Sequence, residues 1–221
     1  MHYSEIERRV REVLARVPPG VTVLAATKGR SPEEIRAAIR AGIRHVGENY
    51  VQEAERKRSQ VPEPASWHMI GRLQRNKARR ALGTFDWLQT LDSLPLAERL
   101  ERLLAEQNRN LPVLVQVNIG REPQKAGVLP EELPGFLSQL AAFPHLKVRG
   151  LMAIPPAPTR QEDSRPYFRE MKRLFDGLAA EKIPGVALEV LSMGMSADWE
   201  VAVEEGATMI RLGTVLFGPR G

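Results

Sequence analysis

A lysine that follows an apolar run is the side chain best suited to covalent chemistry in the N-terminal part of the sequence. Residues 21–26 are small or apolar apart from one threonine, and Lys28 follows them after Thr27. A lysine at the end of a buried strand is partly desolvated, which favours the neutral amine that forms a Schiff base with a carbonyl. Taken alone, Lys28 is better explained as the residue where a strand meets water.

Two loops near the C-terminal end have the composition of an anion-binding site. One is SMGMSAD, Ser192–Asp198, and the other is RLGT, Arg211–Thr214. Small residues before a helix leave backbone N–H groups free for an anion, which the helix dipole also favours. Two ordinary capped turns are the alternative. We favour a phosphorylated ligand, because in α/β barrels the loops after strands seven and eight often bind phosphate.

Three further polar residues have a structural explanation beside a functional one. Asn49 follows a candidate strand, where it can contact a ligand or cap the next helix, and capping is favoured. His68 lies within a strand, and a single histidine there is more often structural than catalytic. Lys125 lies in a loop and is a second amine that could meet an aldehyde, although a loop lysine is usually only solvated.

Arg211 lies within the last candidate strand, where a guanidinium needs a hydrogen-bond acceptor. Glu48 and Glu189 are the carboxylates that could pair with it in the core.

The chain is basic, with a net charge of +5 and a pI of about 9.8. Its most basic stretch is residues 72–80, which could contact phosphate or nucleic acid. Acidic residues are interspersed through the sequence, and no aromatic residue interrupts this stretch. A solvated helix face is therefore favoured, and nucleic-acid binding is not expected.

Eight strands alternate with helices along the chain. The candidate strands are 21–26, His45–Gly47, Trp67–Ile70, Trp87–Thr90, Val113–Asn118, Val148–Met152, Leu188–Leu191 and Thr208–Leu212. The candidate helices are 3–16, one that begins after Ser31 and stops at Gly42, and those near 49–58, 74–82, 94–108, 130–142, 162–182 and 197–205.

Alternating strands and helices predict a parallel sheet, and eight units in about 200 residues favour a (β/α)₈ TIM-type barrel. We expect a single domain over residues 1–221, with an extra N-terminal helix. No helix is expected after the eighth strand, so helix 3–16 would fill that gap in the outer ring. The rival is a doubly wound open sheet, but TKGR after the first strand is not the Gly-rich phosphate loop of that fold.

Composition excludes several classes of protein. The chain has no cysteine, which excludes disulfides, thiolate metal sites and a cysteine nucleophile, and we expect no metal. No apolar segment is long enough for a signal core or a membrane span, so a cytoplasmic location is expected. No swapped domain or zipper is visible, which favours a monomer.

Seven ordered segments resemble the pyridoxal phosphate homeostasis proteins, also called proline synthetase co-transcribed or alanine-racemase N-terminal-domain-like proteins. The resemblance covers nearly the whole chain. The segments are LAATK (Leu24–Lys28), HVGENYVQE (His45–Glu53), WHMIGRLQRNK (Trp67–Lys77), VQVNI (Val115–Ile119), GLMAI (Gly150–Ile154), SMGMSADWEVAVEEG (Ser192–Gly206) and RLGTVLFGPR (Arg211–Arg220).

The resemblance implies that Lys28 carries pyridoxal 5′-phosphate (PLP) as a Schiff base. The other implied contacts are Ser192, Met193, Ser196, Gly213 and Thr214 with the phosphate, Arg211 with the pyridine nitrogen, and Asn49 and His68 beside the ring. The segment LAATKGRSPEE departs from the VSKTKP of many members and lacks their second lysine. No role is therefore transferred to Gly29 or Arg30.

The resemblance implies a protein of PLP supply with no established reaction. An arginine at the pyridine nitrogen makes PLP a weak electron sink. A racemase needs an acid/base on each face of the substrate carbanion, and Lys28 is the one such residue that the sequence indicates. We therefore expect a carrier or regulator that delivers PLP to apo PLP-dependent enzymes. The alternative is a small PLP-dependent amino-acid racemase.

Overall fold

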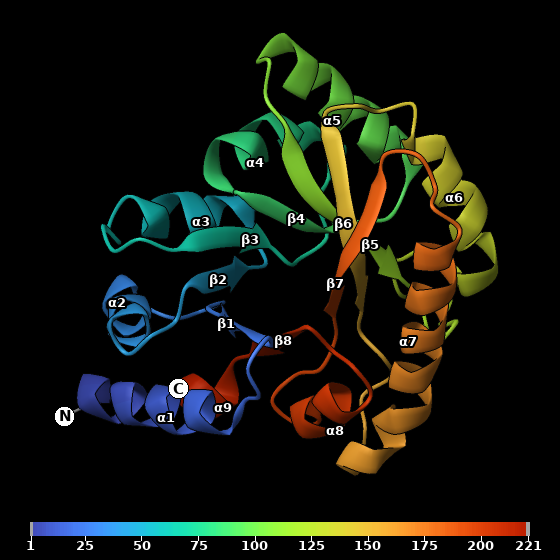
Figure 1. The fold of residues 1–221 in the computed structure, drawn as a ribbon. Coiled ribbons are helices and arrows are strands. Elements are labelled where there is room, and N and C mark those ends of the chain that lie inside the picture. Colours follow the sequence, from blue (N-terminus) through green and yellow to red (C-terminus); the bar gives the residue numbers. More distant parts are fainter. Residues whose placement is uncertain (1, 220–221) are drawn as a thin grey trace.

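The eight strands of the computed structural model close into one parallel barrel, which confirms the predicted fold class (Figure 1). The structure describes residues 2–219. Each strand pairs with the next one in sequence, and β1 closes the barrel by pairing with β8. The strands are β1 (Thr22–Ala26), β2 (His45–Glu48), β3 (Ser66–Met69), β4 (Trp87–Leu91), β5 (Leu111–Val117), β6 (Leu146–Ala153), β7 (Val186–Ser192) and β8 (Met209–Leu212).

The helices lie outside the barrel (Figure 1). They are α1 (His2–Arg16), α2 (Pro32–Arg40), α3 (Val51–Arg58), α4 (Ala78–Thr84), α5 (Leu94–Glu106), α6 (Leu133–Leu140), α7 (Arg165–Ala180), α8 (Trp199–Glu204) and α9 (Thr214–Phe217). The expectation that no helix follows the last strand is wrong, because α9 follows β8. It has only four residues, however, and α1 lies beside it and beside α2.

The hydrophobic core lies between the barrel and the helices. Ile35 on α2, Leu100 on α5 and Phe168 on α7 are fully buried and belong to one cluster with Val46 and Val115 on the strands. Burial of a large aliphatic or aromatic side chain contributes about 1.5–3 kcal/mol, so this layer holds the helices against the barrel.

The start of α2 shows why the element bounds were predictable. The Glu34 N–H donates to Ser31 Oγ at 3.2 Å, and the Ser31 N–H donates to Glu34 Oε2 at 2.7 Å. This capping box satisfies two N–H groups that the first turn leaves unpaired, and Pro32 has no N–H to satisfy. Every predicted strand is present within two residues of its expected bounds.

Three predicted helices begin later than expected as α-helices, because each starts with a 3₁₀ turn. These turns are η1 (Arg75–Lys77) before α4, η2 (Pro130–Glu132) before α6 and η3 (Gln161–Ser164) before α7. Such turns are common at helix N-termini, where the backbone tightens to satisfy its free groups.

Polar side chains occupy part of the barrel interior. Ser192 on β7 donates its hydroxyl proton to Gln89 Oε1 on β4 at 2.7 Å. Because β4 and β7 are not neighbours in the barrel, this bond crosses the interior. Barrels of this kind are usually filled with branched aliphatic side chains, so a buried polar set at this position needs an explanation.

Within residues 2–219, no helix is both long enough and apolar enough to cross a membrane.

Candidate functional site

Lys28 lies at the C-terminal end of the barrel, two residues after β1 ends at Ala26. It is half-buried, and its Nζ lies 5.2 Å from the centre of the Tyr50 ring. Within the described part of the chain, its amine has no hydrogen bond and no ion pair. The amine of Lys28 is thus available to a ligand at the end of the barrel where such folds carry their chemistry.

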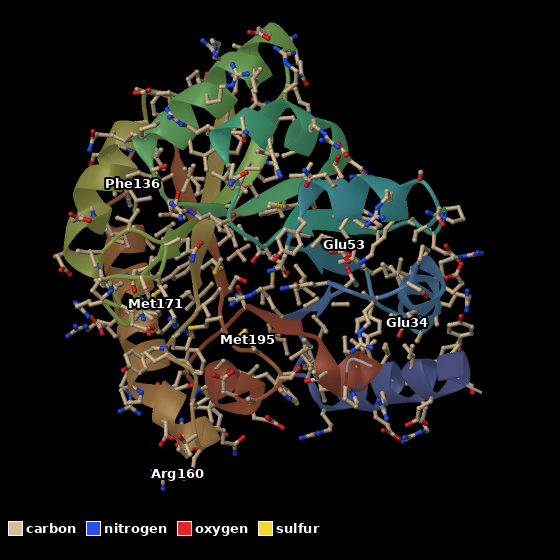
Figure 2. All side chains as sticks on the ribbon, turned by 180° about the vertical axis from the view of Figure 1, so that it is seen from behind. Glu34, Glu53, Phe136, Arg160, Met171 and Met195 are labelled. Atoms are coloured by element: carbon tan, nitrogen blue, oxygen red, sulfur yellow. The ribbon has the colours of Figure 1, made fainter. Side chains whose placement is uncertain are left out.

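The backbone on either side of Lys28 is held by two side chains of α3. Lys57 Nζ donates to the carbonyl oxygen of Thr27 at 2.7 Å. Glu53 Oε1 accepts the N–H of Gly29 at 2.7 Å, and it pairs with Lys57 Nζ at 2.6 Å. Glu53 is labelled in Figure 2. Because both peptide groups that flank Lys28 are bonded, the residue has a defined position.

Glu48 completes this buried ionic cluster from the end of β2. Its Oε1 accepts from Lys57 Nζ at 2.6 Å and from the Thr27 hydroxyl at 2.6 Å. Glu48 is fully buried, and its Oε2 has no hydrogen-bond partner in the part of the chain that the structure describes. Burial raises the pKa of the Glu48 carboxyl, although Lys57 and Thr27 oppose this effect. The cluster therefore depends on the positive charge of Lys57.

The two predicted anion-binding loops meet at Ser196. Its Oγ accepts the backbone N–H of Gly213 at 3.1 Å and that of Val215 at 3.4 Å. Two N–H groups, one from the loop after β8 and one from the first turn of α9, therefore converge on one oxygen from the loop after β7. Thr214, between them, is exposed, and within the described residues neither its hydroxyl nor its N–H has a partner.

Asp198 holds the first of these loops in place. Its Oδ1 accepts the N–H of Met195 at 2.8 Å, and its Oδ2 accepts the Ser164 hydroxyl at 2.7 Å. Asp198 and Ser164 are both buried, and Met195 is labelled in the loop after β7 in Figure 2. A buried carboxylate with two donors fixes the loop that carries Ser196.

The pairing of β1 with β8 places Lys28 beside these loops. Ala25 on β1 is in register with Leu212 on β8, and Gly213 follows directly. Paired strands lie about 5 Å apart, so the segments that leave their C-terminal ends are neighbours. The predicted meeting of Lys28 with the loops after β7 and β8 thus follows from barrel closure.

Arg211 is a buried cation that has no carboxylate partner among residues 2–219. It donates to Ser192 Oγ at 2.8 Å and to the carbonyl oxygen of Ala153 at 2.9 Å. Burial lowers the pKa of its guanidinium to about 10, and the charge of Asp198 opposes this shift. The alternative that Arg211 pairs with a core glutamate is wrong. Glu48 binds Lys57, and the exposed Glu189 binds Arg149.

Ser192 and Met193 are buried too deeply in the protein to suit a contact with a phosphate ligand. The Ser192 hydroxyl is fully buried and already bonded to Gln89 and Arg211. The Met193 side chain is buried in the core, and its N–H donates to the carbonyl oxygen of Met209 at 3.1 Å. The Ser196 hydroxyl and the N–H and hydroxyl of Thr214 are therefore the groups placed to reach a phosphate, whereas the Gly213 N–H is bonded to Ser196 Oγ.

Asn49 and His68 differ in accessibility. Asn49 does not cap α3, because Tyr50 occupies the N-cap position. Its side-chain amide has no partner within the described residues, and it lines a small cavity with Tyr50 and Arg72. His68 is fully buried and is hydrogen-bonded to His45 and Gln89. Asn49 can therefore reach a ligand at the mouth, whereas His68 could approach one only from inside the barrel.

Lys125 and the basic stretch have local partners. Lys125 Nζ lies 2.5 Å from Glu122 Oε2 and donates to the carbonyl oxygen of Pro155 at 3.2 Å. In the basic stretch, Arg79 pairs with Glu106 at 2.8 Å, and Arg80 pairs with a second glutamate. These pairs fit the favoured interpretation of residues 72–80 as a solvated surface.

Three residues of the site were not indicated by the sequence. Lys57 lies in a charged helical segment that resembles a solvent-facing surface, and Gln89 lies in a strand without an obvious motif. His45 begins the segment HVGENYVQE, but the resemblance implied no role for it. One signal for Lys57 existed, because Glu53 precedes it by four residues and such pairs face each other on a helix.

The comparisons with known proteins agree with this geometry. The family model for the N-terminal domain of alanine racemase matches residues 1–221, and the chain belongs to that family. The pyridoxal phosphate homeostasis protein of Aquifex aeolicus is 41% identical over 221 residues, which cover 98% of this chain and 96% of that protein. The protein of the same name from Pseudomonas aeruginosa is 38% identical over 221 residues, 98% of this chain and 94% of that protein. The chain thus falls among the pyridoxal phosphate homeostasis proteins, as the resemblance predicted.

Solved structures support the same assignment. PipY of Synechococcus elongatus with PLP bound has a TM-score of 0.87 and 40% identity, and the match covers 96% of this chain and all of that one (100%). The alanine racemase of Bacillus anthracis has a TM-score of 0.77 at 18% identity, and the match covers 98% of this chain but 56% of that one. This second similarity concerns the fold alone.

Proposed function

We propose that this protein binds PLP as a Schiff base on Lys28 and serves the intracellular supply of that cofactor. The observation that carries the proposal is the juxtaposition of the Lys28 amine with the Ser196 hydroxyl and with the N–H and hydroxyl of Thr214, across the β1–β8 pairing. Among the described residues, the Lys28 amine and both Thr214 groups have no hydrogen-bond partner. An aldehyde carbon for the amine and a phosphate for the donors are both present in PLP. The PLP-bound structure of PipY and the names of the relatives support the choice of this ligand.

Buried groups of the site fit this ligand as well. Arg211 is a desolvated guanidinium with N–H groups left after its bonds to Ser192 and Ala153, because an arginine has five donors. A ring nitrogen is an acceptor that such a donor can bind. Asn49 adds a side-chain amide at the mouth that has no hydrogen-bond partner among the described residues. Ser196 and Thr214 would hold the phosphate.

The site favours holding PLP over turning substrate over. PLP supplies an electron sink when bound, and a guanidinium beside the ring nitrogen weakens that sink by disfavouring protonation there. Tyr50 faces Lys28 through its ring, in a cation–π contact. We infer a carrier that delivers PLP to apo PLP-dependent enzymes.

The attachment is tested by spectroscopy and chemical trapping. PLP is added to the purified protein, the near-ultraviolet and visible spectrum is recorded, and borohydride reduction is followed by peptide mapping. We expect the band of lysine-bound PLP and a label on Lys28. The Lys28→Ala variant should lose both, and the Lys125→Ala control should keep them. Absence of the band in the wild-type protein, or a label on another lysine, would overturn the proposal.

Delivery is tested with a PLP-free aminotransferase and an alkaline phosphatase that destroys free PLP. The loaded protein should restore aminotransferase activity in the presence of the phosphatase, whereas the same amount of free PLP should not. If the phosphatase abolishes the activity in both cases, the protein releases PLP into solution and the delivery function is excluded.

A further inference from the structure

A continuous hydrogen-bonded chain of side chains runs through the barrel from His45 to Arg211. Arg211 donates to Ser192 Oγ at 2.8 Å, and Ser192 donates to Gln89 Oε1 at 2.7 Å. Gln89 Nε2 lies 3.1 Å from His68 Nδ1, and His68 Nε2 lies 3.0 Å from His45 Nδ1. The five residues come from strands β8, β7, β4, β3 and β2, so the chain connects separate parts of the barrel.

Arg211, at one end of this hydrogen-bond chain, determines the donor and the acceptor in every bond of the chain. An arginine can only donate, so Ser192 Oγ accepts there and must use its one proton toward Gln89. The oxygen of Gln89 therefore faces Ser192, and its NH₂ group donates to His68 Nδ1. His68 then carries its proton on Nε2 and donates it to His45 Nδ1.

Burial and packing keep this arrangement in a single state. Ser192, Gln89 and His68 are fully buried, and the His68 ring stacks on Trp87 with a 16° angle between the planes and 5.4 Å between the centres. Burial, and then the neighbouring His45, lower the pKa of His68 to about 3, so its ring is neutral. A reversed bond would place two donors face to face inside the protein, which is costly.

His45 is the first residue of β2 and is half-exposed, so the chain ends near solvent at the N-terminal rim of the barrel. At its other end, Arg211 uses two of its five N–H groups in bonds to described residues, which leaves three for other acceptors. Ser192 Oγ, which belongs to the hydrogen-bond chain, accepts one N–H, and the carbonyl oxygen of Ala153 accepts a second. The guanidinium plane is thereby fixed by two bonds from inside the barrel.

We propose that His45, His68, Gln89 and Ser192 are positioning residues, whose one-way hydrogen-bond chain aims the Arg211 guanidinium at the ligand ring. This proposal rests on the proposed function, because the ring is that of PLP. In this proposal Ser192 and His68 position Arg211, and they do not contact the phosphate or the ring directly. The proposal also assigns the Nε2-protonated tautomer to both histidines.

The tautomers are measured first, without ligand. Long-range ¹H–¹⁵N correlation spectra of the labelled protein should show His68 and His45 protonated at Nε2 and unprotonated at Nδ1. The variant Gln89→Glu has nearly the same volume but offers two acceptors, so His68 Nδ1 should become protonated. The control variant His145→Gln removes a histidine that binds Glu101 away from the chain, and it should leave the other signals unchanged. An Nδ1-protonated His68 in the wild-type protein would overturn the proposal, as would unaltered His68 signals in Gln89→Glu.

The link to the ligand is measured by titration with PLP. Hydrogen bonds to charged groups support a loss of about tenfold in affinity for Ser192→Ala, with a shift of the absorption band of bound PLP. Gln89→Glu keeps an acceptor for the Ser192 hydroxyl and should lose less affinity. The His145→Gln control should bind as the wild type does. Unchanged affinity and spectra in Ser192→Ala would exclude a positioning role. Failure of the wild-type protein to bind PLP would instead overturn the proposed function, and the tautomer experiment would still report on the chain itself.

Discussion

Replacement of Lys57 by methionine should strongly destabilise the protein, although Lys57 does not face the ligand. Its ammonium group binds Glu48, Glu53 and the carbonyl oxygen of Thr27 at 2.6–2.7 Å. Methionine keeps most of the volume and removes the charge. Glu53 can turn to water, since its side chain is 19% exposed, but Glu48 is fully buried. Removal of one partner of a buried ion pair costs about 3–5 kcal/mol.

For a protein of this size, that cost corresponds to a decrease of about 6–20 °C in the melting temperature. Urea and thermal unfolding, followed by circular dichroism, measure it. The loss should depend on pH. In the folded variant the pKa of Glu48 lies above its value in the unfolded chain, so the penalty is small below about pH 4.5 and grows as the pH rises toward the folded pKa. The double variant Lys57→Met/Glu48→Gln should recover roughly half of the loss or more.

The matched control is Lys172→Met, which breaks an exposed pair with Asp176 and should cost about 0.5 kcal/mol or less. The reasoning would be refuted if Lys57→Met unfolded like this control, or if the Glu48→Gln change gave no recovery at neutral pH. The first result would mean that the cluster is not electrostatically important. The second would mean that the damage comes from lost packing.

Three further predictions concern separate parts of the molecule. Burial lowers the folded pKa of His68 to about 3, so the free energy of unfolding should fall as the pH decreases below about 6.5. Urea unfolding at pH 7 and pH 4.5 should show a weaker pH dependence for His68→Gln than for the wild-type protein. Ser164→Ala leaves Asp198 with one donor fewer, so it should cost about 1–3 kcal/mol and weaken PLP binding in titrations, whereas a purely local effect would leave the affinity unchanged. With L-alanine in deuterium oxide, the loaded protein should show no exchange of the α-hydrogen by NMR, and exchange that disappears in Lys28→Ala would establish the racemase alternative.

Much of the fold could be predicted because its signals are local. Apolar runs bounded by turn residues indicate each strand, and the capping box at Ser31 fixes the start of α2. The 3₁₀ starts of α4, α6 and α7 were missed, since the choice between the two helical bonding patterns depends on packing. The short helix α9 was missed because only four residues follow β8 in helical form.

Those parts of the site that lie at the ends of strands could be predicted from the sequence. Lys28 and the loops at Ser196 and Gly213 lie at strand ends, which meet in any barrel of this type. The interior chain was not predictable, because the tilt of the strands decides which residues of β4 and β7 meet. Ser192 shows the difference, since its neighbours in sequence suggest a phosphate contact and its partners in space are Gln89 and Arg211.

The pairing of β1 with β8 has a consequence for the synthesis of the protein. Gly213 and Thr214 leave the ribosome about 185 residues after Lys28, which corresponds to roughly 10–40 s of translation. During that interval, a nascent chain has the amine without the groups that would hold a phosphate. A ligand that must contact both Lys28 and the residues after β8 can bind only the closed barrel. Such a ligand stabilises the closed barrel by mass action. PLP would therefore bind and stabilise complete chains with a closed barrel, and it would not bind incomplete nascent chains in this way.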